Sequence, residues 1–159
     1  MFDRRDKTGQ NQQMKKIVAP LSSLPLRSEA FEYVRKAHQM ETAEDYVELI
    51  ADLIAERGEA RVVDLAETFG VSHATVNKII LRLNKEGYVT NRPYRSLFLT
   101  VAGEKLAKSS KERHDIVYRF LRAIGVDEHA AQMDAEGVEH HVSEKTLAAF
   151  KKFLKKTAS

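Results

Sequence analysis

Three residues near the C-terminal end of the chain have the spacing of metal ligands. In "DAEGVEHHVSEK", residues 134–145, Glu136, Glu139 and His140 fall at positions i, i+3 and i+4. These positions share one face of an α-helix. Carboxylates this close repel one another, so this face is either fully hydrated or holds a cation. His141 is rotated by about 100° from His140, and we expect it either behind a ligand or at the surface.

Other oxygen and nitrogen donors could join this group. Asp45 and Glu48 form an i, i+3 pair on a predicted helix, and His114 lies on the apolar face of another. Four carboxylates and two imidazoles suit a divalent cation that accepts oxygen and nitrogen ligands. Each residue also has an ordinary alternative: Asp45 suits a capping box with Thr42, Glu48 a solvated charge and His114 a core histidine. The histidines without acidic partners at ligand spacing have no expected metal role: His38, His73 and His129.

The composition excludes several classes of protein. The 159 residues are 43% hydrophobic and 31% charged, which fits one or two globular domains. Cysteine is absent, which excludes disulfides, iron–sulfur clusters, thiolate zinc sites and cysteine nucleophiles. There is no apolar run of about 20 residues and no signal-peptide core, so we expect a cytoplasmic protein. No H-E-x-x-H motif, phosphate loop or nucleophile elbow is present, and an enzyme is not expected. A di-metal enzyme is the alternative of a different class.

The positive charge is concentrated in two segments. Residues 1–28 contain six Lys or Arg and two Asp, and residues 71–100 contain five Lys or Arg and one Glu. Each segment therefore has a net charge of +4, whereas the whole chain has only +3. This distribution predicts a surface that binds a polyanion, next to an acidic region that attracts cations.

The hydrophobic pattern predicts a mainly α protein of two domains. We expect a flexible basic arm over 1–27, a winged helix-turn-helix DNA-binding domain over 28–100, and a helical dimerisation and metal-binding domain over 101–159. The expected helices and strands are these: helices at 28–39, 41–57, 61–69 and 72–86, two strands around a turn at 93–96, and helices at 101–124, 127–141 and 144–156. The last three helices would begin after Thr100, Asp127 and Ser143.

The segment "FGVS", residues 69–72, is typical of the turn of a helix-turn-helix motif. Phe69 and Val71 are expected to pack inward while Gly70 makes the bend. The next helix would bury Val76, Ile79, Ile80 and Leu83; Leu81 then points outward, which does not suit an apolar residue. The candidate DNA-binding residues are Ser72, His73, Ala74, Thr75, Asn77, Lys78 and Arg82 on this helix, with Arg92, Tyr94 and Arg95 at the tip of the wing. The simpler alternative is a core helix with a solvated basic face.

Three quoted segments resemble one family. The segments are "EDYVELIADLIAERGEARVVDLAETFGVSHATVNKIILRLNKEGYV", "FLTVAGEKLAKSSKERH" and "AEGVEHHVSE". They are similar to the manganese transport regulators, a branch of the diphtheria-toxin-repressor family, over residues 41–154. The resemblance implies a homodimeric, metal-activated repressor. It places the family's metal ligands on Asp45, Glu48, His114, Glu136, Glu139 and His140.

The resemblance also implies which metal the protein senses. Iron-sensing relatives have Met where this chain has Asp45 and Cys where it has Glu136, and hard oxygen ligands favour Mn²⁺ over softer ions. We therefore expect two Mn²⁺ ions per protomer, a palindromic DNA operator and control of manganese uptake genes. Two carboxylates about 5 Å apart repel by about 3 kcal/mol at an effective dielectric constant of about 20. The junction between the domains should therefore loosen without metal. An iron- or zinc-responsive regulator of the same fold is the nearest alternative.

Overall fold

The structure is a computed structural model that describes residues 24–91 and 96–157. It divides into two compact units, Met1–Lys36 and Ala37–Ser159. The described part of the first unit is helical, and Lys36 Nζ lies 2.9 Å from Glu32 Oε1 within it. In the second unit, an N-terminal half of helices with a small sheet and a C-terminal helical half follow one another along the chain, as the mainly α prediction expects. Among the described residues, no helix is long and apolar enough to cross a membrane.

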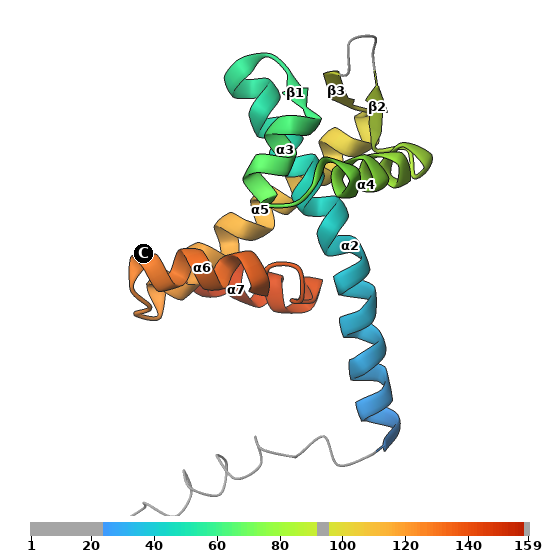
Figure 1. The fold of residues 1–159 in the computed structure, drawn as a ribbon. Helices are drawn as coiled ribbons and strands as arrows, with labels where there is room; N and C mark the ends of the chain where they lie inside the picture. The colour runs from blue at the N-terminus through green and yellow to red at the C-terminus, as the bar shows by residue number, and fades with distance from the viewer. Residues whose placement is uncertain (1–23, 92–95, 158–159) are drawn as a thin grey trace, which may run out of the picture. The chain divides into compact units, whose positions relative to one another are not determined.

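The first described element is the long helix α2 (Leu24–Arg57) (Figure 1). The prediction of two helices, 28–39 and 41–57, was wrong, because the helix does not break between them. The residues at this point, Gln39, Met40 and Glu41, are all good helix formers, and no Gly or Pro interrupts them. The helix also starts inside the segment predicted as an arm; Pro25 is tolerated there because it lies in the first turn. The rest of that predicted arm, residues 1–23, lies outside the described residues.

Two short helices form the helix-turn-helix motif, as predicted. They are α3 (Val62–Phe69) and α4 (His73–Lys85). Between them Gly70 has φ of 64°, a conformation that residues with a Cβ rarely adopt, and the Ser72 hydroxyl accepts a hydrogen bond from Thr75 N at 3.1 Å. Phe69 packs inward and stacks on Tyr46 of α2 with ring centroids 4.5 Å apart. Val71 was expected to be buried with it, but 37% of its surface is exposed.

The wing is part of a three-stranded antiparallel sheet. The two predicted strands are β2 (Val89–Asn91) and β3 (Ser96–Leu99), and most of the predicted turn between them lies outside the described residues. A third strand, β1 (Ala60–Arg61), was not predicted; with two residues it is too short to show an alternating pattern. It pairs with β3, so that the strand order is β1-β3-β2.

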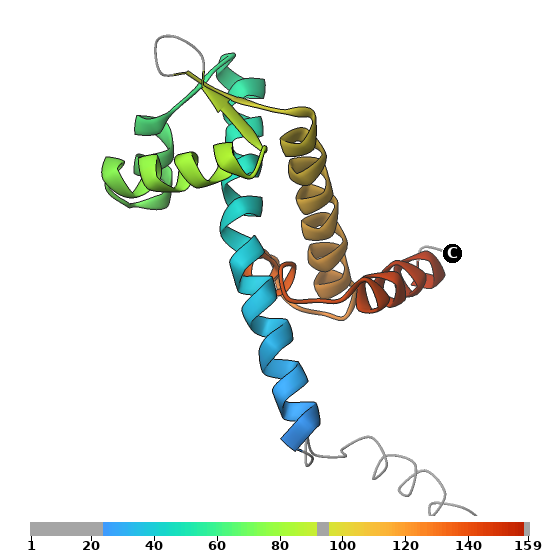
Figure 2. The ribbon, with the colours of Figure 1, turned by 90° about the vertical axis from the view of Figure 1, so that its right-hand side faces the viewer.

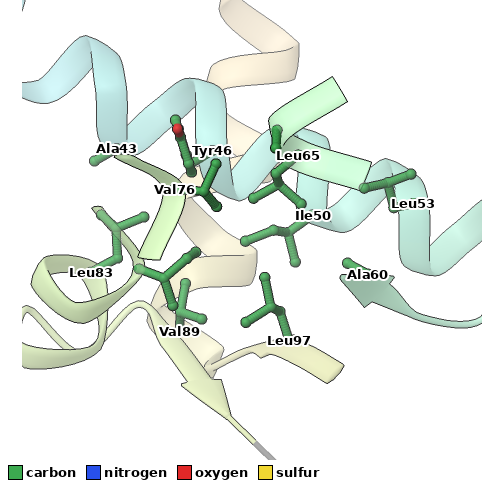
Figure 3. Close-up of a cluster of buried hydrophobic side chains, with 12 residues drawn as sticks. Ala43, Tyr46, Ile50, Leu53, Ala60, Leu65, Val76, Leu83, Val89 and Leu97 are labelled. Carbon is green, nitrogen blue, oxygen red and sulfur yellow. The ribbon is translucent and has the colours of Figure 1, made fainter. Parts of the chain in front are cut away.

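One hydrophobic core joins α2 to the helix-turn-helix motif and the sheet. Tyr46 and Ile50 of α2 lie in it together with Val76 and Leu83 of α4, and Figure 3 shows them converging. Ile79 is only partly buried at the edge of this core. Because α2 contributes to this core along one side, any movement of α2 in this region would carry α4 with it.

Three helices form the C-terminal half. They are α5 (Val101–Ala123), α6 (Glu128–Val138) and α7 (Glu144–Thr157). The side chains of the three predicted caps each accept a hydrogen bond from a backbone N–H three residues later: Thr100, Asp127 and Ser143. A second core contains Val117, Ala135 and Leu147, and Phe120 stacks on Phe150 with centroids 3.8 Å apart.

Two details of this half differ from the prediction. Ile124 was expected in the core but is 53% exposed, because α5 ends just before it. The helix α6 ends at Val138 rather than at residue 141, so Glu139 and His140 lie just beyond its last turn.

Candidate metal centre and nucleic-acid interface

The six predicted metal ligands come from three elements of the second unit. Asp45 and Glu48 lie on α2, His114 lies on α5, and the other three lie on α6 or directly after it: Glu136, Glu139 and His140. Figure 2 shows α5 running beside the part of α2 that packs against the helix-turn-helix motif. Two side-chain contacts connect these helices: Ser110 donates to Glu48 Oε2 at 2.8 Å, and Lys111 pairs with Asp52.

Glu139 is the most buried of the six residues when side chain and backbone are taken together. It is only 2% exposed although it carries a carboxylate. Its backbone conformation remains close to helical, and its N–H still donates to Ala135 O at 3.0 Å. Its Oε2 is 2.7 Å from His114 Nδ1, an ion-pair distance, yet it accepts no well-directed hydrogen bond among the described residues. A buried carboxylate oxygen in this condition is where a cation would be expected.

His114 lies between two carboxylates. Its Nδ1 is 2.7 Å from Glu139 and 3.4 Å from Glu136. The polar contact with Glu139 raises the pKa of His114 above its ordinary value, against the opposing effect of burial. These three residues bring one ligand atom each to within 4.8 Å of one another, so they can hold one cation together.

His140 joins the end of α6 to α2. Its Nε2 lies 3.0 Å from Asp45 and 3.4 Å from Glu139, and its Nδ1 lies 2.6 Å from Glu44. Burial opposes the charged ring, but the contacts with Asp45 and Glu44 outweigh it and raise the pKa of His140 to about 10. Without metal, a protonated ring therefore supplies the positive charge among these carboxylates.

Asp45 and Glu48 occupy different surroundings. The capping-box alternative for Asp45 is excluded because α2 runs through Thr42 without a break. Glu48 is not among the groups of close ligand atoms found in the described chain. Burial raises its pKa, which the hydrogen bond from Ser110 partly offsets. Both carboxylates, with Glu136, line an open cavity of about 380 Å³.

Two acidic residues near this centre were not predicted. Glu44 binds the second ring nitrogen of His140, and Glu41 lies with Asp45 and His140 in a group of close ligand atoms. On the sequence they appear as ordinary charges of an amphipathic helix. The spacing of Glu41 and Asp45, i and i+4, was the available signal. The residues present thus fit a divalent cation: several carboxylates, two imidazoles, no thiolate and one buried oxygen that lacks a hydrogen bond.

The predicted DNA-binding residues of the second helix are exposed. These are Ser72, His73, Ala74, Thr75, Asn77, Lys78 and Arg82. Leu81 is 62% exposed, so it does point outward. The Ser72 hydroxyl contacts both the backbone and the hydroxyl of Thr75, and Arg82 lies 3.6 Å from Glu86. The wing residues Arg92, Tyr94 and Arg95 lie outside the described residues.

Comparisons with known proteins agree with both halves. The family model described as iron dependent repressor, N-terminal DNA binding domain, matches residues 38–97. The one described as iron dependent repressor, metal binding and dimerisation domain, matches residues 100–159.

Individual relatives are similar over much of the chain. It is 52% identical over 141 residues to the transcriptional regulator MntR of Escherichia coli O6:H1, which covers 89% of this chain and 91% of that protein. It is 46% identical over 100 residues to the HTH-type transcriptional regulator MntR of Bacillus subtilis strain 168. This match covers 63% of this chain and 70% of that protein.

Two solved structures share the fold at close to 30% identity. The manganese regulator SloR superimposes with a TM-score of 0.63 and 29% identity over 71% of this chain, and the chain spans about half (53%) of SloR. A manganese-dependent transcriptional repressor in complex with manganese superimposes with a TM-score of 0.63 and 28% identity. The match covers 71% of this chain and 52% of that one. The two family models together cover most of the chain, which therefore belongs to the iron-dependent repressor family of metal-dependent transcriptional regulators, DNA-binding proteins that are not enzymes.

Proposed function

We propose that this protein is a manganese-responsive repressor in which Mn²⁺ is the corepressor. The observation that carries the proposal is the buried carboxylate of Glu139, which lies between His114 of α5 and His140, while His140 contacts Asp45 of α2. A divalent cation held here would supply positive charge directly to these carboxylates, where the protonated ring of His140 now lies. The names of similar proteins, which include manganese regulators, support the choice of metal.

The ligand set also supports manganese. Oxygen ligands from carboxylates outnumber the imidazoles, and neither Cys nor Met is among the six proposed ligands. Ions later in the first transition series bind most such sites more tightly than Mn²⁺, so selectivity must come from geometry and ligand type. An iron- or zinc-responsive regulator is the second candidate, supported by the iron-dependent family to which the chain belongs.

We infer two ions per protomer. Two groups of close ligand atoms contain proposed ligands, and they lie on the two sides of Glu139: His114 with Glu136 and Glu139, and His140 with Asp45 and Glu41. Glu48 lines the same cavity as Asp45 and Glu136, and this supports its place among the proposed ligands.

The proposed mechanism uses the helix that the two halves share. Asp45 and Glu48 lie on the same helix as Tyr46 and Ile50, which pack in the core with Val76 of α4. When α2 is tied to the C-terminal half through its carboxylates, α4 is held as well. In a homodimer this would fix the spacing of two α4 helices for the half-sites of a palindromic operator. Such a regulator would act in the cytoplasm, on genes for manganese uptake.

DNA binding with and without Mn²⁺ tests the proposal. The probe is duplex DNA selected from a random pool by the Mn²⁺-loaded protein. We expect the unsubstituted protein and Glu128→Gln, an exposed control on α6, to bind the selected DNA at least tenfold more tightly with Mn²⁺. Glu139→Gln should remain folded and lose this response. A metal response retained by Glu139→Gln would overturn the site, and DNA affinity independent of any divalent ion in the unsubstituted protein would overturn the proposed function.

A further inference from the structure

A third group of ligand atoms lies beside the candidate metal centre and contains none of its six proposed ligands. His38 and Glu41 are on α2, and His141 follows the end of α6. Glu41 Oε2 lies 2.7 Å from His38 Nδ1 and 3.8 Å from His141 Nε2. One ligand atom of each residue lies within 4.8 Å of the others.

Part of this arrangement needs no metal. His38 and Glu41 are at i, i+3, and a histidine–carboxylate pair at this spacing stabilises a helix by itself. That explanation does not account for His141. It comes from another segment of the chain, and its Nε2 lies 3.8 Å from the same Glu41 oxygen atom. The two imidazole nitrogens and the Glu41 carboxylate oxygen could therefore occupy three of the four corners of a tetrahedral metal site.

The geometry and chemistry of this group suit zinc better than manganese. Zn²⁺ is commonly held by three protein ligands of the His₂Glu type and a water molecule, with bonds of about 2.0–2.2 Å. Ligand atoms in such a tetrahedron are about 3.3 Å apart, between the two separations of 2.7 and 3.8 Å found here. The His38 side chain is 79% exposed, which leaves space for the water ligand. The two nitrogen ligands contrast with the oxygen-rich set of the candidate metal centre.

We propose that His38, Glu41 and His141 form a separate site for Zn²⁺ or a divalent ion of the same ligand preference. The site connects α2, one turn before Asp45, to the segment that carries His140. An ion bound there would therefore strengthen the same connection between α2 and the end of α6 that Asp45 and His140 make. The site does not require that Mn²⁺ be the corepressor, since neither of its histidines belongs to a proposed Mn²⁺ group; Glu41 alone is shared, with the group of Asp45 and His140.

Counting bound ions in matched histidine variants tests the proposal. The variants are His38→Gln with His141→Gln, and, as a control, His73→Gln with His129→Gln, two exposed histidines of α4 and α6. Metal-free full-length protein is dialysed against buffered Zn²⁺, and bound Zn²⁺ per protomer is measured by elemental analysis. In a second series, bound Mn²⁺ is counted by EPR of the free ion.

We expect the His38/His141 variant to bind one Zn²⁺ per protomer fewer than the control and the unsubstituted protein, with an unchanged number of Mn²⁺. His38→Gln alone, which removes a largely exposed ring and cannot impair folding through burial, should weaken the binding of that Zn²⁺ at least tenfold. Equal Zn²⁺ numbers in all variants would overturn the site and leave the Mn²⁺ proposal intact. Loss of Mn²⁺ together with Zn²⁺ would also overturn it, because these histidines would then belong to the candidate metal centre.

Discussion

Asp45 Oδ1 lies 3.0 Å from His140 Nε2. This contact joins α2, which contributes to the core of the DNA-binding half, to the segment after α6 in the C-terminal half. Without metal it is an ion pair between a carboxylate and a histidine whose pKa is raised to about 10. The proton on His140 and a metal ion therefore compete for the same position.

The first prediction concerns pH. The pKa of His140 is raised to about 10, so near pH 7 a metal ion must displace its proton; the pKa of His114 is raised above 6.5, which adds to the proton release. We expect the binding of Mn²⁺ to release at least about one proton per protomer and its affinity to rise from pH 6.5 to 8. Titration calorimetry in buffers of different ionisation enthalpy counts these protons. Release of none would show that the rings are neutral or do not bind metal.

The stability of the metal-free protein should change in the opposite sense. A raised folded-state pKa stabilises the fold fully below the unfolded value of about 6.5, and this stabilisation is lost as the pH rises through the folded value, about 10 for His140. The contribution of these histidines therefore decreases from pH 6.5 towards pH 10. Urea unfolding measures the free energy of unfolding of the unsubstituted protein and of His140→Gln. We expect the difference between these two free energies to shrink as the pH rises.

The second prediction concerns Arg113, which positions Glu139. Its guanidinium donates to Glu139 O at 2.8 and 3.1 Å and to Val142 O at 2.7 Å, and it pairs with Glu144 at 2.5 Å. A lysine cannot reproduce this planar set of donors. Arg113→Lys should therefore weaken Mn²⁺ binding by about 10–100-fold, as the loss of a residue that orients a ligand commonly does.

Arg119→Lys is the matched control for this change. Arg119 is on the same helix but makes an exposed pair with Asp115 at 3.3 Å, and pairs of this kind contribute little. Its Mn²⁺ affinity should stay within twofold of the unsubstituted protein. If EPR titrations gave the two variants the same affinity, the fixed position of Glu139 would not matter for metal binding.

The third prediction concerns the junction between the sheet and α5. A Cβ added at Gly103 would lie 2.1 Å from Tyr88 O and 3.3 Å from Leu99 Cβ. The backbone at Tyr88 would have to move, so Gly103→Ala should lower the free energy of unfolding by about 1–3 kcal/mol. Gly137→Ala is the control. A Cβ added there would meet no other part of the structure within 4 Å, and helix propensity predicts that the free energy of unfolding rises by up to about 1 kcal/mol. Urea unfolding of the metal-free variants measures both, and a neutral Gly103→Ala would contradict the close approach.

The local signals in the sequence predicted most of the fold. Caps such as Thr100 and Asp127 act through hydrogen bonds within three residues, so the sequence alone locates them. The prediction divided α2 near residue 40, although no Gly or Pro there breaks a helix. The strand β1 depends on pairing with β3, a contact over a long sequence distance that local patterns do not contain.

The candidate site was predicted less completely than the fold. Spacing predicted that Glu136, Glu139 and His140 share one helical face, but it could not show that α6 ends at Val138, before Glu139 and His140. Glu44 and Glu41 were missed because their roles depend on His140 and His141, which approach from another segment. His38 was given no acidic partner, although Glu41 lies three residues after it. The roles of all the proposed ligands and DNA contacts remain predictions.

The fourth prediction concerns Lys78 on the exposed face of α4. If α4 lies in the major groove, the Lys78 side chain contacts either a phosphate or a base edge. Lys78→Ala should weaken DNA binding about tenfold or more and leave Mn²⁺ binding unchanged. Lys145→Ala, exposed at the start of α7, should leave both unchanged.

Loss of a phosphate contact would weaken the binding of all DNA sequences equally and reduce the slope of log affinity against log salt by about 1. A base contact would relax the preference at one position of the operator and leave other sequences bound as before. Unchanged affinity for every sequence would place this face of α4 outside the groove, and the positive charge of residues 71–100 would then have to act through the wing.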